Sequence, residues 1–363
     1  MDYNSKIYIA GHNGLVGSAI LKNLKDKGYN NFILRSHAEL DLTDQAAVAQ
    51  FFSTEKPEYV FLAAAKVGGI LANNVYRGQF IYENLMIQNN VIHHSYINGV
   101  KKLIFLGSTC IYPKEAPQPM SEDSLLTSPL EYTNEPYAIA KIAGIKMCES
   151  YNLQYGTNFI SVMPTNLYGP NDNFNLETSH VLPAMLRKIY LGSCLEKNDW
   201  NAICKDLNDR PIEKISGSCS VNEILRILAK YGVQKDTASG KVRVELWGTG
   251  KPMREFLWSE EMADASVFVM ENVEFQDVIS TLGTEEIRNT HINIGTGNEI
   301  SIANVADIIK NIVNFGGDIW FNSEKPDGTM RKLTDVTQLN KLGWKSAIDI
   351  QTGICRLYEW YRN

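Results

Sequence analysis

Residues 6–17 read Lys6-Ile7-Tyr8-Ile9-Ala10-Gly11-His12-Asn13-Gly14-Leu15-Val16-Gly17. The first five residues predict a short buried strand, and the glycine-rich turn leads into a helix expected over Gly14–Lys27. Gly11 permits a tight turn, Gly14 lets the backbone approach a pyrophosphate, and Gly17 lets the helix pack closely on a sheet. Unpaired amides at the helix start favour the phosphate charge. This stretch therefore predicts a dinucleotide-binding turn.

The first half of the chain alternates β-rich runs with helical stretches. Strands are expected at Lys6–Ala10, Phe32–Arg35, Tyr59–Ala64, Lys102–Gly107 and Phe159–Met163, and the main helices at Phe80–Ile97 and Tyr137–Tyr155. This rhythm is typical of a parallel sheet covered by helices on both faces. We expect an α/β protein with a Rossmann doubly wound parallel sheet and a smaller α/β substrate-binding domain.

The pattern changes after about Pro170, where loops lengthen and strands are scattered. Further strands are expected at Val242–Trp247 and His291–Ile294, and a closing helix near Gln351–Trp360. We assign residues 1–170 and about 248–295 to the dinucleotide-binding domain. The smaller domain then comprises about 171–247 and 296–363.

The polar segment Gly192–Lys241 stands out within the smaller domain. Ser220 and Glu223 have capping-box spacing and predict one helix at this point. We expect the segment to be a peripheral excursion. The alternative is that it reshapes the substrate pocket.

Composition excludes several classes of protein. The 363 residues carry 35 Lys+Arg against 41 Asp+Glu, a formal net charge of −6. No overall basic field points to nucleic acid or a membrane surface as a partner. We see no apolar core of a signal peptide and no apolar run long enough to cross a bilayer. The six cysteines form no CxxC pair and the histidines show no metal-ligand spacing, so we expect reduced thiols, no metal and a cytoplasmic protein.

Arg35 and Ser36 lie at the end of the second expected strand. An NAD enzyme usually carries an acidic residue there for the ribose 2′-hydroxyl, whereas a cation and a hydroxyl suit a 2′-phosphate. The sequence therefore predicts NADP(H) as the cofactor. Asp41 and Leu42, further along the chain, are expected to border the adenine.

Tyr137 and Lys141 put a phenol and an ammonium four residues apart, on one face of a helix. A free tyrosine has a pKa near ~10, and a neighbouring cation favours the phenolate and lowers that pKa. Ser108, just beyond the fourth strand, would add a hydrogen bond to the same substrate oxygen. The three residues predict hydride transfer in which Tyr137 gives its proton to a ketone oxygen and Lys141 also holds the nicotinamide ribose.

With these residues the chain resembles the extended short-chain dehydrogenase/reductases and, more narrowly, the GDP-L-fucose synthases. The runs that carry the resemblance are Ala64–Ile70, Gly107–Pro113, Pro164–Pro170, Ser179–Pro183 and Met253–Leu257. The likeness covers nearly the whole chain apart from about Gly192–Lys241. It implies NADPH-dependent reduction at C4 of a GDP-linked 4-keto sugar, with epimerisation at C3 and C5, by a homodimer joined through helices.

The resemblance also implies which residues contact the cofactor. They are Gly11, Asn13, Gly14, Leu15, Val16, Gly17, Ala63, Ala64, Ala65, Tyr137, Lys141, Pro164, Asn166, Leu167 and His180. Asn13 stands where the family often has an arginine for the 2′-phosphate. The NADP preference therefore rests more heavily on Arg35.

The same resemblance assigns Cys110 and His180 to epimerisation. A C4 ketone acidifies the hydrogens on C3 and C5, so a base can remove one to give an enolate that Ser108 and Tyr137 stabilise. Cys110 would be the base, provided that its pKa lies below the free-thiol value near ~8.5, and His180 the acid on the opposite face. Substrate contacts are implied for Ser108, Cys110, Asn166, Arg187, Trp247, Arg254 and Lys332. Of these, the guanidinium groups suit the GDP diphosphate.

Three alternatives use the same residues. The first is a C4-reductase only, acting on another GDP-4-keto sugar such as a GDP-heptose already epimerised by a separate enzyme. The second is a nucleotide-sugar 4,6-dehydratase, but that reaction needs an acidic pair where this chain has Thr109-Cys110. The third is a non-catalytic NADP(H) sensor, which would normally lack Tyr137 or Lys141, and both are present.

Overall fold

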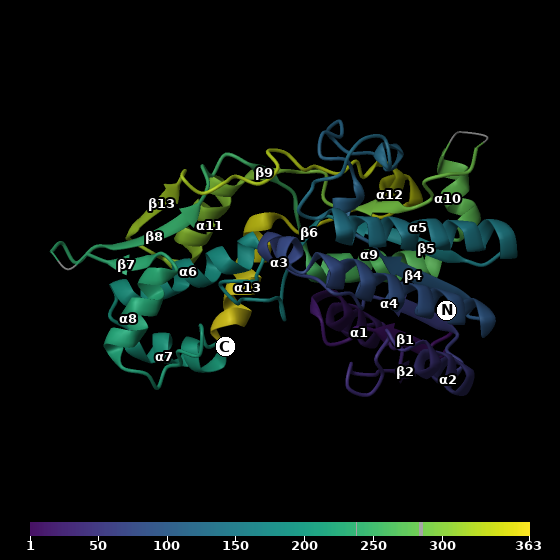
Figure 1. Cartoon of the computed structure of the whole chain (residues 1–363), viewed down its shortest axis with the longest axis horizontal. Coiled ribbons are helices and arrows are strands. Elements are labelled where there is room, and N and C mark those ends of the chain that lie inside the picture. The colour runs from purple at the N-terminus through teal and green to yellow at the C-terminus, as the bar shows by residue number, and fades with distance from the viewer. Residues whose placement is uncertain (237, 283–285) are drawn as a thin grey trace. The chain divides into compact units, whose positions relative to one another are not determined.

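The computed structural model describes residues 1–236, 238–282 and 286–363, which form two compact units (Figure 1). Unit 1 comprises Met1–Asn171, Glu255–Asn298 and Lys332–Ile348, and unit 2 comprises Asp172–Arg254, Glu299–Arg331 and Asp349–Asn363. Two stretches lie in the other unit from the one expected. Residues 248–254 belong to unit 2 because Met253 and Arg254 pair with Ser301 and Ile300. Residues 332–348 belong to unit 1, where Thr334 forms a β-bridge with Met120.

Unit 1 is built on a six-stranded parallel sheet in the order β11-β5-β4-β3-β1-β2. The strands are β1 (Ile7–Ala10), β2 (Phe32–Ile33), β3 (Tyr59–Leu62), β4 (Lys102–Leu106), β5 (Phe159–Pro164) and β11 (Ile292–Ile294). The order reverses between β1 and β3, and ligands of open α/β sheets bind outside the carboxyl ends of the strands at such a point. The predicted doubly wound fold is confirmed, with β2 and β3 shorter than expected.

Helices cover both faces of this sheet. Ile7 and Ile9 of β1 lie in one apolar cluster with residues of α1 (Leu15–Asp26) and α9 (Ser259–Asn272). The alternate residues Tyr8 and Ala10 lie in a second cluster, on the opposite face. That cluster includes residues of α2 (Gln45–Glu55), α4 (Arg77–Ile97) and α5 (Glu135–Tyr155). Successive residues of a strand point to opposite faces, so a strand buried on both sides is apolar throughout.

The shorter elements of unit 1 lie between these helices and strands. They are α3 (Ile70–Val75), η1 (Thr109–Ile111), η2 (Glu122–Ser124), β6 (Asn166–Tyr168), β10 (Phe256–Trp258), α10 (Phe275–Leu282) and α12 (Thr337–Leu342). Strands β6 and β10 pair in parallel. No helix in the described part of the chain is long and apolar enough to cross a membrane.

Unit 2 contains a three-stranded sheet in the order β13-β8-β7, with β13 parallel and β7 antiparallel to β8. These strands are β7 (Val233–Lys235), β8 (Val242–Trp247) and β13 (Asp318–Asn322). The remaining elements are α6 (Val181–Glu196), α7 (Trp200–Asp209), α8 (Val221–Lys230), β9 (Met253–Arg254), β12 (Ile300–Ser301), α11 (Ile302–Val313) and α13 (Ile350–Arg362). Helix α6 packs against β8 and α11, and α11 packs against α13.

The segment Gly192–Lys241 is part of unit 2 rather than a peripheral excursion with one helix. The capping box at the start of α8 is present, with Ser220 N donating to Glu223 Oε2 at 2.9 Å. The structure adds α7, which Asp199 caps through Ala202 N, and β7 at the sheet edge. Sequence reasoning missed α7, although Asp199 is a residue type that often caps a helix and could have marked its start. Residue 237 of this segment lies outside the described residues.

Candidate active site

The turn after β1 uses glycine where a side chain has no room. Gly11 has φ +86°, and a Cβ on it would lie 2.8 Å from Ala64 N, just beyond β3. A Cβ on Gly17 would lie 2.1 Å from Gly11 O, so α1 packs directly on the turn. Gly14 is the N-cap of α1 and donates its N–H to Gly11 O at 3.0 Å. The turn and the start of α1 therefore fit a pyrophosphate at the reversal point of the sheet.

The other residues expected around this turn lie in the turn, in the first turn of α1 or at the end of β3. Asn13 is exposed, and Leu15 and Val16 are half-buried in the first turn of α1. Ala63, half-buried like Ala64 and Ala65, donates its N–H to Ala10 O at 3.0 Å. The carboxyl ends of β1 and β3 thus meet at the glycine turn.

Arg35 and Ser36 follow β2, and both have carboxylate partners. Arg35 Nη2 lies 2.6 Å from Glu55 Oε1 and Nη1 donates to Leu34 O at 2.9 Å. Ser36 donates from both its N–H and its hydroxyl to Glu39 Oε2, at 2.7 Å each. These bonds lower the pKa of Glu39. Because Glu39 occupies the donors of Ser36, Arg35 is the stronger candidate for a 2′-phosphate.

Asp41 and Leu42 lie between β2 and α2. Asp41 Oδ1 accepts hydrogen bonds from Thr43 N at 2.9 Å and Thr43 Oγ1 at 2.8 Å, which lower the pKa of Asp41. Leu42 is buried, and its carbonyl accepts from Asn90 Nδ2 at 2.9 Å. Their backbone is therefore fixed by unit 1 itself.

Pro164, Asn166 and Leu167 lie at the junction of β5 and β6. Pro164 is buried and pairs in register with Ile294 of β11. Asn166 Nδ2 donates to Glu255 O at 2.8 Å, and Leu167 is half-buried. All three lie in unit 1, near the carboxyl end of β5.

Ser108, Tyr137 and Lys141 come together at the carboxyl end of β4. Ser108 is the N-cap of η1, and its Oγ accepts from Cys110 N at 3.3 Å. Lys141 is 3% exposed and donates to Leu106 O at 2.8 Å. Its Nζ lies 5.8 Å from the centroid of the Tyr137 ring, as the spacing of four residues on α5 predicts.

Burial dominates the proton affinities of this group. It lowers the pKa of Lys141 to about 8 and raises the pKa of Tyr137 above its ordinary value. The sequence predicts that the neighbouring Lys141 lowers the pKa of Tyr137, and this prediction is wrong for the structure described. Desolvation of the buried phenolate is the main cause of the raised pKa of Tyr137, and Cys110 adds to it.

Cys110 lies beside Ser108 in η1 and is half-buried. Burial raises the pKa of its thiol, and Lys332, Ser108 and Lys141 offset this only in part. Burial of Cys110 therefore opposes the low thiol pKa that a base requires. The backbone explains why Lys332 lies near, since Leu333 O accepts from Met120 N at 2.8 Å.

Four of the expected residues belong to unit 2. His180 is the exposed N-cap of α6. Trp247, at the end of β8, is 63% exposed, with Lys325 Nζ 5.4 Å from the ring centroid. Arg254 is half-buried, donates from Nη1 to Met253 O at 2.7 Å, and has its pKa lowered by burial. Arg187 differs because it is fully buried and its guanidinium is paired with Asp206 of α7.

Sequence reasoning missed two groups near these residues. Glu255 is fully buried and accepts hydrogen bonds from Thr334 N at 3.0 Å and Gly297 N at 2.7 Å. Lys188, next to Arg187, is half-buried, donates to Glu245 O at 3.3 Å, and has its pKa lowered to about 8 by burial. Glu255 lies in Met253–Leu257, a run that the sequence analysis used only for the family resemblance. Lys188 lies in no motif that would single it out from the sequence. Within residues 1–236, 238–282 and 286–363, no three His, Cys, Asp or Glu side chains are grouped to hold a metal ion.

A doubly wound sheet with a glycine turn after β1 and a Ser–Tyr–Lys set at β4 and α5 defines the short-chain dehydrogenase/reductase class. A family model, described as the NAD dependent epimerase/dehydratase family, matches residues 7–205 and 225–295. GDP-L-fucose synthase 1 of Arabidopsis thaliana is 48% identical over 360 residues, covering 99% of this chain and 94% of that protein. The chain therefore belongs to the NAD dependent epimerase/dehydratase family, within the group that contains the GDP-L-fucose synthases.

Two solved structures from Campylobacter jejuni are also similar. A GDP-D-glycero-L-gluco-heptose synthase, solved in the presence of NADPH, is 46% identical with a TM-score of 0.91. A GDP-mannoheptose C4 reductase with NADP bound is 46% identical with a TM-score of 0.85. In both cases the match covers 100% of this chain and 100% of the other.

Proposed function

We propose that this chain is an NADP-dependent oxidoreductase that reduces C4 of a GDP-4-keto-6-deoxy-hexose and epimerises C3 and C5, as a GDP-L-fucose synthase does. The observation that carries the proposal is the grouping of Ser108, Tyr137, Lys141 and Cys110 in unit 1 of a chain whose full-length relatives bear that name. NADPH supplies the hydride when bound. The residues of the chain orient the sugar and move protons.

Tyr137 is the proton donor of the reduction. Because burial holds its pKa high, the phenol stays protonated at neutral pH until hydride reaches C4. As negative charge develops on the C4 oxygen, that oxygen becomes basic enough to take the proton of the Tyr137 phenol. Ser108 donates a hydrogen bond to the same oxygen, and the charged Lys141 stabilises the phenolate. Proton transfer of this kind contributes about 10²–10⁴-fold to a rate.

Cys110 and His180 carry the epimerisation. The Cys110 thiolate removes a proton from C3 or C5, and the electron pair of that C–H bond forms an enolate whose oxygen is held by Ser108 and Tyr137. His180 returns a proton to the opposite face of the same carbon, which inverts it. The raised pKa of Cys110 makes the thiolate scarce in the free protein. Bound substrate and the nearby Lys332 must therefore help to form it.

Unit 2 provides the GDP contacts. The exposed ring of Trp247 offers a face for the nucleotide, and Arg254 a fork for the diphosphate. Arg187 has its donors occupied inside unit 2, so we assign its expected role to Lys188 instead. Unit 1 then binds NADP(H) through the glycine turn and Arg35. Asn166 and Lys332 are proposed to contact the sugar.

Two further properties follow from the resemblance. Exposed apolar residues lie on α4 and α5, among them Tyr82 and Leu153. We assign these two helices to the interface of a homodimer. The enzyme would act in the cytoplasm, where NADPH and nucleotide sugars are available.

A second candidate is C4 reduction alone, on a GDP-4-keto-heptose that another enzyme has already epimerised. The specific observation in its favour is that the two heptose enzymes match this chain over the full length of both partners. The two candidates differ in whether C3 and C5 exchange hydrogen with solvent.

The test is NADPH oxidation with GDP-4-keto-6-deoxy-mannose in D₂O, with the product followed by NMR. Turnover to GDP-L-fucose with deuterium at C3 and C5 supports the first candidate. Turnover without deuterium at these carbons leaves a reductase only. Absence of turnover on the hexose, together with turnover on a GDP-4-keto-heptose, supports the second candidate.

A further inference from the structure

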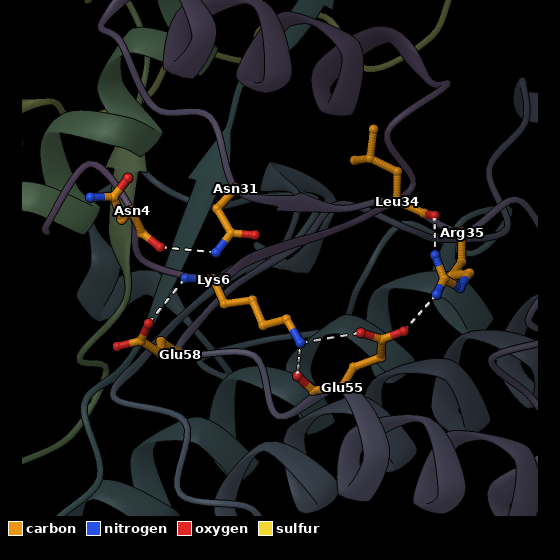
Figure 2. Close-up of polar contacts among 7 residues, drawn as sticks. All are labelled: Asn4, Lys6, Asn31, Leu34, Arg35, Glu55 and Glu58. Carbon is orange, nitrogen blue, oxygen red and sulfur yellow. Dashed lines mark hydrogen bonds and ion pairs between the residues drawn. The ribbon is translucent and has the colours of Figure 1, made fainter.

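Glu55, the last residue of α2, lies between two cations of unit 1. Figure 2 shows its carboxylate between the Arg35 guanidinium and the Lys6 ammonium. Oε1 is 2.6 Å from Arg35 Nη2, and Oε2 is 3.3 Å from Lys6 Nζ. Lys6 also donates to the Glu55 carbonyl at 2.5 Å. The end of α2 is thereby tied to the start of β1 and the end of β2.

These contacts fix the Arg35 side chain from two sides. Nη2 is held by Glu55, and Nη1 by Leu34 O at 2.9 Å. The guanidinium carbon also lies 5.9 Å from the centroid of the Phe51 ring. An arginine has five N–H donors in a planar fork, so two bonds leave others for a ligand. An arginine that is already ordered loses less freedom when it binds a phosphate.

The charges around Glu55 do not cancel the positive charge of Arg35. Glu55 contributes one negative charge, and Lys6 and Arg35 contribute two positive ones. Two further carboxylates lie in this region. Glu58 accepts from the Lys6 backbone N at 3.1 Å and pairs with Lys101 at 2.5 Å. Glu39, which also interacts with Arg35, accepts two hydrogen bonds from Ser36. Lys6 therefore offsets the charge of Glu55, so the ion pair with Glu55 does not by itself neutralise Arg35.

We propose that Glu55 is a positioning residue for cofactor choice, holding Arg35 at the carboxyl end of β2 in the orientation that receives the 2′-phosphate of NADP(H). The inference rests on the role of Arg35 in the proposed function. It extends that function because Glu55 discriminates between cofactors without touching either of them. Stability alone does not account for the pair, since half-exposed ion pairs add little to it.

The experiment compares dissociation constants for NADPH and NADH, measured by fluorescence without any sugar. The proteins are the full chain, Glu55→Gln, the matched control Glu58→Gln, Arg35→Ala and the double variant Glu55→Gln/Arg35→Ala. Glu55→Gln is expected to weaken NADPH about tenfold and leave NADH within about twofold. Glu58→Gln is expected to change neither. In the double variant, Glu55→Gln adds no further loss to that of Arg35→Ala, because it acts through Arg35.

Three results would overturn the inference. Equal weakening of NADPH and NADH by Glu55→Gln would mean a structural role only. Tighter NADPH binding would mean that Glu55 competes with the phosphate. If Arg35→Ala did not change the ratio of the NADPH and NADH dissociation constants, Arg35 would not bind the 2′-phosphate and Glu55 could not act through it. All three are read from cofactor binding alone, so they are distinct from a failure to turn over a GDP-4-keto sugar.

Discussion

Arg187 donates from both Nε and Nη2 to one oxygen, Oδ1 of Asp206, at 3.0 and 2.9 Å, and both side chains are buried. Asp206 Oδ2 accepts from the Tyr361 hydroxyl, and Arg187 also donates to the carbonyls of Phe174 and Arg210. The pair thus joins α6, α7 and α13 to the loop that precedes His180. This buried network makes the segment Gly192–Lys241 structural for unit 2, since α7 supplies Asp206.

Loss of Asp206 is the first testable change. Asp206→Ala leaves a guanidinium buried without its counter-charge, which costs about 3–5 kcal/mol. We expect the free energy of unfolding, measured by urea denaturation, to fall by that amount. Asp209→Ala, at an exposed site on the same helix, serves as the control and should stay within about 0.5 kcal/mol. A loss below about 1 kcal/mol for Asp206→Ala would show that the pair does not hold unit 2 together.

The pH dependence of reduction tests Lys141. Its pKa of about 8 means that the positive charge beside Tyr137 is present below pH 8 and lost above it. We therefore expect kcat/KM for C4 reduction to be level up to about pH 7, to be about halved at pH 8 and to be about tenfold lower at pH 9. Lys141→Arg keeps the charge at all these pH values, so its profile, normalised at pH 7, should stay level. Lys146→Arg, on the same helix, is the control and should follow the native profile. If kcat/KM of Lys141→Arg also fell above pH 8, deprotonation of Lys141 would not be the cause of the fall.

The pH dependence of epimerisation tests Cys110 and should have the opposite sign. Since burial raises the thiol pKa, the thiolate is a minor species at pH 7 that grows about tenfold per pH unit below the pKa. Deuterium entry at C3 and C5 should rise between pH 7 and 8, where reduction starts to fall. Cys110→Ser should lower deuterium entry by about 10²-fold or more and abolish the rise. Cys355→Ser, in unit 2, is the control, and a rise that survives in Cys110→Ser would assign the base elsewhere.

Local patterns explain which parts of this site could be predicted from the sequence. Tyr137 and Lys141 lie one helical turn apart, and Ser108 lies just beyond a buried strand. Together with the alternating strand–helix pattern, this spacing predicts that they meet at one end of the sheet. The glycine turn is predictable for the same reason. Asp206 could not be foreseen, because a buried partner of Arg187 depends on how α7 folds back on α6. The raised pKa values of Tyr137 and Cys110 also depend on burial, which no local pattern reports.

The hydrogen bonds of the buried Glu255 carboxylate could not be predicted from the local sequence either. Its carboxylate binds Thr334 N at 3.0 Å and Thr296 N and Gly297 N at 2.7 Å each, and so fixes the backbone two residues beyond Lys332. Glu255→Gln replaces one acceptor oxygen by an NH₂ group that faces N–H donors. We expect the free energy of unfolding to fall by about 1–3 kcal/mol.

Because the carboxylate of Glu255 also sets the place of Lys332, Glu255→Gln should affect chemistry as well as stability. Lys332 lowers the pKa of Cys110, so a displaced Lys332 should reduce deuterium entry at C3 and C5 more than it reduces hydride transfer to C4. Glu260→Gln, at a half-exposed site near the start of α9, is the control for both measurements. If Glu255→Gln lowered deuterium entry and hydride transfer equally, Glu255 would not act on the Cys110 thiol through Lys332. Its role would then be structural only.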